Sequence, residues 1–289
     1  MEANKLSRVD GTPLYHYTDA AGLNGILANR NLWLTDRSHL NDPTEVNYGL
    51  QFAENALDRE ADSDNGLRRL FCSGMSEGLK RAPPKLAYYV GSMSLANNLP
   101  TQWCKYADGG RGYCIEFSAT AFDNICATYC GSLRVSVHKM DYDKSAIRKR
   151  QEAAIREVLR LIDDPATRDA ITPDNCQGFV KELWTLLSTL LLWNALPFKD
   201  EKYHSEEEAR VLLFGPLKEV IQDPAHRTRI RRAELVPFFD MAFMCPPTSR
   251  IISTITVGPT APDAAIDAVQ RLLLSNGHID VQVNRSDLP

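Results

Sequence analysis

Segments with the two-residue alternation of β-strands are interleaved with helical segments along this chain, and the order of the two is irregular. A regular alternation of strand and helix would favour a parallel βα array, so the irregular order favours an α+β fold. With 289 residues, 44% hydrophobic and 24% charged, the chain is long enough to bury a full core. We therefore predict a single α+β domain over 1–289, in which helices flank a mixed or antiparallel sheet, with a helical insertion at about 143–197.

The first 35 residues predict a strand, a short helix and a second strand. The aromatic segment 14–17 follows a Gly and a Pro, as a strand entered from a turn does. Thr18 or Asp19 is placed to cap the helix, and Asn31 suits a left-handed residue at its end. The second strand is predicted at 32–35.

The rest of the chain continues this mixture. A helix start is predicted at Asn41-Asp42-Pro43-Thr44-Glu45, where Asp caps, Pro takes the first helical position and Glu follows three residues after the cap. Further helices are predicted at 67–79, 143–162, 174–195 and 262–275. Further strands are predicted at 86–95, 112–118, 134–140, 208–214, 251–257 and 279–283, and 235–244 is a mixed apolar run.

Composition excludes several classes of protein. The formal net charge is -4, so a nucleic-acid contact would require a local basic patch. The longest apolar run, 183–196, is shorter than a membrane span, and the amino terminus has no export signal. We predict a cytoplasmic protein, or an effector delivered without a signal peptide, with no membrane partner.

The seven cysteines have no paired spacing, which favours reduced thiols and argues against a structural zinc site. No metal is predicted. Walker-type, dinucleotide-fold, Gly-x-Ser-x-Gly, His-Glu-x-x-His and EF-hand patterns are absent. The remaining candidates are polar and aromatic residues near strand ends, where split active sites are built.

The first candidate is the strand that carries His16. Side chains alternate along a strand, so His16 and Thr18 share one face, and Tyr15 and Tyr17 share the other. The polar face is a candidate site. The alternative is that His16 donates a hydrogen bond inside the core while the tyrosines pack.

The second candidate is the segment 102–112, in which Trp103 and Tyr106 precede a glycine-rich turn with Arg111. Such a loop is able to stack a flat ring and hold a phosphate, because Arg has several donors and Gly lets backbone N–H groups approach. The alternative is a structural turn in which Trp103 and Tyr106 are packing anchors.

The third candidate is Glu206-Glu207-Glu208-Ala209-Arg210, which leads into an apolar strand. Glu206, Glu208 and Arg210 share a face there. Two close carboxylates repel each other, so one of them is expected to have a raised pKa or to be held by Arg210. A carboxyl group in either state is able to act on a sugar hydroxyl or to stabilise an oxocarbenium-like centre. The alternative is a solvated acidic strand end with a structural salt bridge.

Several motifs resemble a large bacterial domain-of-unknown-function family, and the likeness spans nearly the whole chain. They are Leu-Tyr-His-Tyr-Thr at 14–18, Leu-Trp-Leu-Thr at 32–35, Asn-Asp-Pro-Thr-Glu at 41–45, Trp-Cys-Lys-Tyr-Ala-Asp at 103–108, Arg-Gly-Tyr-Cys-Ile-Glu-Phe at 111–117, Glu-Glu-Glu-Ala-Arg at 206–210 and Ile-Thr-Val-Gly-Pro at 255–259.

The opening His strand, short helix and second strand, followed by a late Glu on a strand, resemble the ADP-ribosyltransferase superfamily, including DarT-type toxins that modify DNA. This resemblance implies a split sheet around a cleft that binds NAD. His16 would bond a ribose with help from Thr18, and Glu208, or else Glu206, would polarise the ribose 2′-hydroxyl. The implied cofactor-binding residues are His16, Tyr17, Thr18, Trp33, Asn41, Trp103, Tyr106, Arg111 and Arg210.

One departure concerns the second strand, which has no Tyr where a His-Tyr-Glu enzyme has one. Trp33 is the nearest aromatic residue there. The leading hypothesis is an NAD-dependent ADP-ribosyltransferase that acts as a toxin, effector or phage-defence component on a protein or nucleic-acid acceptor. The alternatives are a non-catalytic module that binds a nucleotide or nucleic-acid end, and a hydrolase of a nucleotide or glycosidic bond.

Overall fold

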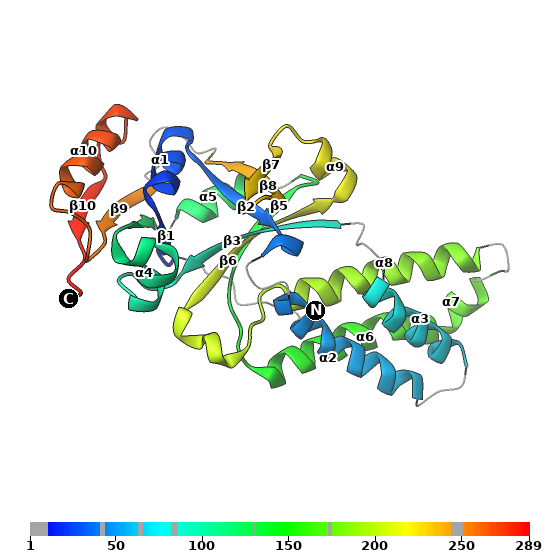
Figure 1. Cartoon of the computed structure of the whole chain (residues 1–289). Coiled ribbons are helices and arrows are strands. Elements are labelled where there is room, and N and C mark those ends of the chain that lie inside the picture. The colour runs from blue at the N-terminus through cyan, green and yellow to red at the C-terminus, as the bar shows by residue number, and fades with distance from the viewer. Residues whose placement is uncertain are drawn as a thin grey trace. The chain divides into compact units, whose positions relative to one another are not determined.

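The chain divides into two compact units (Figure 1). The computed structural model describes residues 11–289 except 41–43, 63–65, 82–85, 119, 130, 171, 173–174 and 244–250. We call the part made of 41–87 and 141–201 the helical unit, and the part made of 7–40, 88–140 and 202–289 the sheet unit.

The helices that we predicted as an insertion at 143–197 belong to a larger unit, because the two helices of 44–81 join them. The helical unit contains α2 (Thr44–Asp62), α3 (Leu67–Arg81), α6 (Lys144–Asp163), α7 (Pro165–Ala170) and α8 (Cys176–Ala195). Helix α2 packs against α3, α6 and α8. Buried Gln151 ties three of these helices together, since its Nε2 donates to the carbonyl oxygens of Gly49 at 3.2 Å and Leu191 at 3.1 Å.

The sheet unit is built on a mixed sheet, in which β10 runs parallel to β9 and most other neighbours are antiparallel. Over the described residues its main path is β10-β9-β4-β1-β3-β2-β8-β7, and β6 pairs with both β3 and β5. The strands are β1 (Leu14–Thr18), β2 (Asn31–Asp36), β3 (Leu86–Ser94), β4 (Tyr113–Phe117), β5 (Arg134–Lys139), β6 (Glu208–Pro216), β7 (His226–Arg231), β8 (Glu234–Ala242), β9 (Ile252–Val257) and β10 (Gln282–Arg285).

Five helices accompany this sheet: α1 (Ala20–Asn29), α4 (Pro100–Tyr106), α5 (Ala121–Thr128), α9 (Leu217–Gln222) and α10 (Ala265–Ser275). The predicted cap of α1 is Asp19, whose carboxylate accepts from the Gly22 N–H at 2.8 Å. The left-handed residue after α1 is Arg30, with φ of 51°, and Asn31 is already the first residue of β2. The prediction for Asn31 was therefore one residue late.

The sheet forks at β3. Strand β1 pairs with β3 at Ser94, whereas β2 pairs with it at Val90 and Tyr89. Strand β6 pairs with β3. Two contacts mark this pairing: just after β3, the Leu95 N–H donates to the Glu207 carbonyl at 2.7 Å, and within β3, a Cβ added to Gly91 would lie 3.7 Å from the Cβ of Val211. A strand has two edges, so β1 and β2 share the other edge of β3 at different positions.

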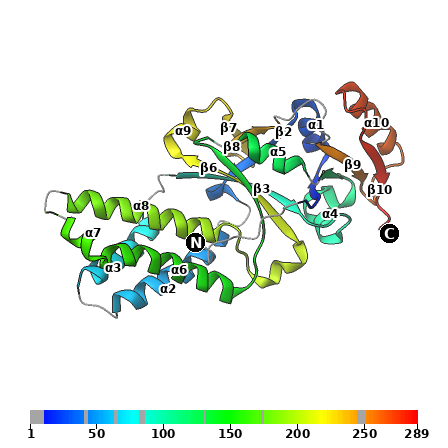
Figure 2. The same ribbon diagram turned by 180° about the vertical axis from the view of Figure 1, so that it is seen from behind.

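Beyond the fork the two strands take different partners. Strand β1 continues beside β4, and β2 continues beside β8. Both views show β1 on the side of β9 and α4, and β2 on the side of β7 and β8 (Figures 1 and 2). The described residues thus form an α+β fold with a mixed open sheet flanked by helices, as the sequence predicted in its coarse form.

Pairing assigns side chains to the two faces of the sheet, because paired residues point to the same face. Tyr15 pairs with Ser94 and Thr35 pairs with Val90, and Val90 and Ser94 lie an even number of residues apart on β3. Tyr15, Tyr17, Trp33 and Thr35 therefore share one face, which we call the Trp33 face. His16 belongs to the opposite face of β1.

One strand boundary and one unassigned strand show where the prediction and the structure differ. The last strand was predicted at 279–283, but β10 is Gln282–Arg285, and Ile279 is 79% exposed. The segment 226–231 was not assigned, yet it forms the edge strand β7. In both places the partner strand sets the pairing, which local alternation does not report.

Candidate functional site

His16 lies at the fork. Its Nδ1 is 3.2 Å from the carbonyl oxygen of Ser92, on the part of β3 between the positions paired with β1 and β2. A carbonyl only accepts, so Nδ1 carries the proton and Nε2 of the neutral ring is an acceptor. Burial lowers the pKa of His16, and the bond to Ser92 offsets part of this shift. The ring is therefore kept neutral.

Tyr17 and Trp103 are packing residues rather than an open stacking platform. Their rings meet edge to face at 5.1 Å, and Trp103 is 2% exposed. The Tyr17 hydroxyl donates to the Ala96 carbonyl at 3.1 Å and accepts from the Leu99 N–H at 3.0 Å. Nε1 of Trp103 donates to Asn98 at 3.0 Å. These contacts hold the loop before α4, so we remove both rings from the predicted NAD site.

Thr18 is also enclosed, at the junction of β1 and α1. It is 9% exposed, and a Cβ on Gly22 would lie 2.0 Å from its Oγ1. The close approach of the first turn of α1 therefore accounts for the glycine. A structural role explains Thr18 without a ligand.

The glycine-rich turn with Arg111 packs against the end of β9. The Gly258 N–H donates to the Gly112 carbonyl at 2.9 Å, and a Cβ on Gly258 would lie 2.1 Å from the Gly110 oxygen. Arg111 reaches back to Asp108, with Nη2 3.1 Å from Oδ1. The glycines thus permit close backbone packing. Tyr106, before the turn, is 40% exposed.

Glu206 and Glu208 are buried in separate ion pairs. Glu206 Oε1 lies 2.7 Å from Lys105 Nζ, and Glu208 Oε1 lies 2.9 Å from Arg210 Nε. Arg210 is only 2% exposed. The salt bridges of the structural alternative are present, but both carboxylates are buried at 5% exposure and not solvated as that alternative expected.

Glu208 lies on the Trp33 face. The rings of Tyr88 on β3 and Phe214 on β6 stack with centroids 6.3 Å apart, so these side chains share a face. Ser94 lies six residues after Tyr88 and Glu208 six residues before Phe214, so both share that face as well. Ser94 pairs with Tyr15, which belongs to the Trp33 face. His16 belongs to the opposite face of β1. The predicted convergence of His16, Trp103 and Glu208 on one face therefore does not occur. Asn41 lies outside the described residues.

Trp33, by contrast, is an accessible flat ring. It is 44% exposed and packs on Phe238, with ring centroids 4.5 Å apart. The Arg229 guanidinium lies over the Trp33 ring at 5.4 Å. We call Trp33, Phe238, Asp240, Arg227 and Arg229 the Trp33 cluster.

Asp240 pairs with Trp33 across β8 and β2. Its Oδ2 lies 3.4 Å from Arg227 Nη1, while its Oδ1 is buried without a hydrogen-bond partner in the described structure. Burial raises the pKa of Asp240, although Arg227 and a hydrogen bond from Trp33 act in the opposite direction. A perturbed carboxyl group beside an accessible ring is a candidate functional group.

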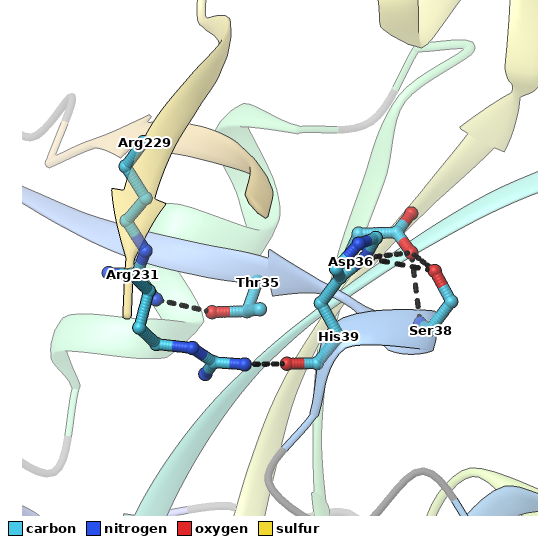
Figure 3. A network of polar contacts seen from close by, with 6 residues as sticks. All are labelled: Thr35, Asp36, Ser38, His39, Arg229 and Arg231. Carbon is cyan, nitrogen blue, oxygen red and sulfur yellow. Dashed lines mark hydrogen bonds and ion pairs between the residues drawn. The ribbon is translucent and has the colours of Figure 1, made fainter. Parts of the chain in front are cut away.

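One further arginine, Arg231, extends this cluster along β7 (Figure 3). Arg229 Nη2 donates to the Thr35 hydroxyl at 2.9 Å, and Arg231 Nη2 donates to the His39 carbonyl at 2.7 Å. Asp36, at the end of β2, accepts from the Ser38 N–H at 2.9 Å and from its hydroxyl. Thr35 of β2 therefore holds Arg229, and His39 in the short turn after β2 holds Arg231.

Sequence reasoning included Trp33 but missed Asp240 and the β7 arginines. Their signal is nevertheless visible, because Arg227, Arg229 and Arg231 alternate with other residues as one face of a strand requires. Asp240 is likewise an isolated acid within an apolar run. The pairing of β2 with β8, which brings Asp240 to Trp33, is not visible locally.

Residues 102–211 match the family model described as Protein of unknown function (DUF2971). The match includes the Trp103 segment and the Glu206–Arg210 segment, and it confirms the predicted resemblance to a domain-of-unknown-function family. No curated protein and no solved structure matches the chain.

Two other kinds of site are absent from the described residues. No helix there combines the length and apolar composition needed to cross a bilayer. No group of three or more His, Cys, Asp or Glu side chains in that part of the chain is placed to hold a metal ion. A pocket in the helical unit contains none of the predicted site residues; it is lined by Ala166, Thr167, Ala170, Asn175 and Phe179.

Proposed function

We propose that the sheet unit binds NAD at its fork and transfers the ADP-ribosyl group to an acceptor. The observation that carries this proposal is the divergence of β1 and β2 from β3, which leaves His16 on one arm and, on the opposite face of the sheet, Trp33 and Asp240 on the other arm. A split sheet with a His on the first strand is the arrangement that the resemblance to ADP-ribosyltransferases implies. The proposed setting is the cytoplasm, with a role as a toxin, effector or phage-defence component.

The state of His16 suits binding of a ribose. The bond to Ser92 holds the ring through Nδ1, so that Nε2 of the neutral imidazole is an acceptor for a hydroxyl proton. A charged imidazolium would offer only donors. His16 is therefore proposed to bind a hydroxyl group of the ligand from its own face of the fork, opposite the face that carries Trp33 and Asp240.

Trp33 is the proposed partner of the nicotinamide ring. It is exposed on the second strand, where the resemblance implies an aromatic residue, and Arg229 and Phe238 restrict its motion. A fixed ring loses little conformational entropy when a flat ligand stacks on it. This assignment replaces Trp103 and Tyr17, whose rings lie in the core.

Asp240 is the proposed carboxylate, in place of Glu208 and Glu206. Glu208 is paired with the buried Arg210 at 2.9 Å and Glu206 with the exposed Lys105 at 2.7 Å, whereas Asp240 makes a looser contact of 3.4 Å with the exposed Arg227 and adjoins the accessible Trp33 ring. In the reaction the bond between C1′ of the ribose and nicotinamide breaks, and its electron pair leaves with nicotinamide. The acceptor then bonds to C1′ and releases a proton. Asp240 would polarise the 2′-hydroxyl and stabilise the positive charge at C1′.

The test is nicotinamide release from NAD, with transfer of labelled ADP-ribose to components of a cell extract. We expect Asp240→Asn to lower release by about 100-fold or more, the scale of a lost electrostatic contact in a transition state. His16→Ala and Trp33→Ala should weaken NAD binding, and Trp33→Phe should restore part of it. Asp267→Asn, at an exposed acid of α10, is the matched control.

Two results would decide against parts of this proposal. Wild-type protein that neither releases nicotinamide nor transfers label has no such activity. If Glu208→Gln abolishes release in a folded protein while Asp240→Asn does not, the catalytic carboxylate is Glu208. Thermal melting of each variant separates loss of activity from loss of folding.

The second candidate function is binding of a nucleotide or nucleic-acid end without turnover. The ion pairs of Glu206 and Glu208 favour it, because two of the predicted catalytic groups already have structural partners. Saturable NAD binding without nicotinamide release would identify this function. Release of free ADP-ribose with water as the acceptor would identify a hydrolase instead.

A further inference from the structure

We propose that the arginines of β7 form a binding surface for single-stranded nucleic acid, with Trp33 stacking on a base. We call Arg227, Arg229 and Arg231 the arginine strip. This surface goes beyond the proposed function, and binding to it does not require NAD. Since Trp33 is also the proposed partner of nicotinamide, the strand and NAD would compete for this ring.

Geometry places the three arginines in a row. Alternate residues of a strand point to one face at intervals of about 6.5 to 7 Å. Arg227 pairs with Phe238, which also pairs with Thr35, so the arginine strip lies on the Trp33 face. Since β7 ends the strand order in the described structure, the strip follows an edge of the sheet. A linear polyanion would meet the three guanidinium groups in succession, and the exposed Arg227 would exchange or share its 3.4 Å contact with Asp240.

The contacts of Arg229 leave its positive charge available. It donates to the neutral Thr35 hydroxyl, and its buried Nε has no hydrogen-bond partner among the described residues. Burial and the nearby charge of Arg231 both lower the pKa of Arg229. Two like charges held together in this way attract an anion, and Arg binds phosphate through several parallel donors.

Trp33 distinguishes a single strand from a duplex. An exposed ring is able to stack on an unpaired base, whereas the bases of a duplex are already stacked on one another. Because Arg229 lies over Trp33, the aromatic and cationic parts of the surface are contiguous. The net charge of the protein is -4, so this strip is the local basic patch that a nucleic-acid contact requires.

The test is fluorescence anisotropy with a labelled oligothymidylate of about twelve nucleotides, a length within the usual range for such sites. The titrations use the full chain without NAD, at a series of salt concentrations. Three phosphate contacts on a single strand predict a slope of log K against log salt of roughly -2. A duplex of equal length should bind more weakly.

Variants test which residues carry the binding. Arg227→Gln and Arg231→Gln should each weaken binding by about threefold to tenfold at low salt and reduce the slope by roughly 0.7. The corresponding Arg→Lys variants keep the charge and should keep most of the slope. Trp33→Ala should remove the preference for the single strand. Arg271→Gln, at an exposed position of α10, removes the same charge elsewhere and should bind like wild type.

The inference is overturned if no salt-dependent binding is seen, if the duplex binds more tightly, or if Arg227→Gln and Arg231→Gln behave like Arg271→Gln. Each of these results leaves the NAD proposal intact, because nicotinamide release is measured without an oligonucleotide. Conversely, oligonucleotide binding by a protein that does not cleave NAD supports this surface alone.

Discussion

Single residues in this chain show how burial decides the role of a charged group. Glu208 and Arg210 are 5% and 2% exposed, and their 2.9 Å contact compensates two charges that are both removed from water. Glu152 and Arg156 on α6 form a more exposed pair at 3.7 Å. Loss of one partner is therefore expected to cost more stability in the buried Glu208–Arg210 pair than in the exposed Glu152–Arg156 pair.

Arg210→Met should lower the free energy of unfolding by about 3 to 5 kcal/mol, because it leaves the Glu208 carboxylate buried without its cation. Arg156→Met, the exposed control, should change it by less than about 1 kcal/mol. Urea denaturation followed by circular dichroism measures both. Equal effects of the two substitutions would show that the Glu208 pair has no special structural role.

His16 carries a pH-dependent contribution to stability. Burial depresses the pKa of His16 in the folded protein relative to the value of 6.5, so the unfolded chain binds a proton more readily. The stability that neutral His16 contributes is present above pH 6.5 and is lost as pH falls below it, by up to about 1.4 kcal/mol per pH unit.

His16→Gln should remove this dependence, because Gln does not gain a proton in that range but retains a donor for the Ser92 carbonyl. The measurement is urea denaturation of wild type and variant at several pH values from about 5 to 7.5. His204→Gln, at an exposed position, is the control. Identical pH slopes for wild type and His16→Gln would contradict the prediction.

At the scale of elements, two glycines differ in whether the surrounding structure has room for a side chain. Gly258 follows β9, and a Cβ there would lie 2.1 Å from the Gly110 carbonyl oxygen. Gly25 is in the middle of α1, and a Cβ there would meet nothing within 4 Å. Close packing of two loops requires the first glycine, whereas the second only reduces the helical propensity of its segment.

Gly258→Ala should therefore destabilise the protein by about 1 to 3 kcal/mol, since backbone atoms must move to admit the methyl group. Gly25→Ala should stabilise it by about 0.5 to 1 kcal/mol. Differential scanning calorimetry should show melting temperatures that move in opposite directions. A shift in the same direction for both variants would contradict the account of the turn.

Most elements were predicted from local patterns, but the strand β7 and the short helices α4, α5 and α9 were not. Strands β1, β2 and β4 were found because aromatic and β-branched residues alternate there. Strand β7 was missed because its exposed edge carries arginines in place of apolar residues. Its identity depends on its pairing with β8, and pairing is a non-local property.

At the scale of the whole molecule, the proposed functional residues belong to the sheet unit. His16, Trp33, Asp240 and the arginine strip come from 7–40 and 202–289. The intervening segments 41–87 and 141–201 form the helical unit, so the sheet unit is assembled from discontinuous parts of the chain. The fork itself requires β3 and β6, which lie far apart in sequence.

The sequence by itself determined the α+β class, most of the strands and helices, and the resemblance to a domain-of-unknown-function family. These properties depend on side-chain periodicity, capping and short motifs, which act over a few residues. The tertiary structure alone decided that Trp103 and Glu208 have packing and ion-pair roles, and that Asp240 lies beside Trp33. Burial and strand pairing set those outcomes, because both depend on contacts between residues that are distant in the chain.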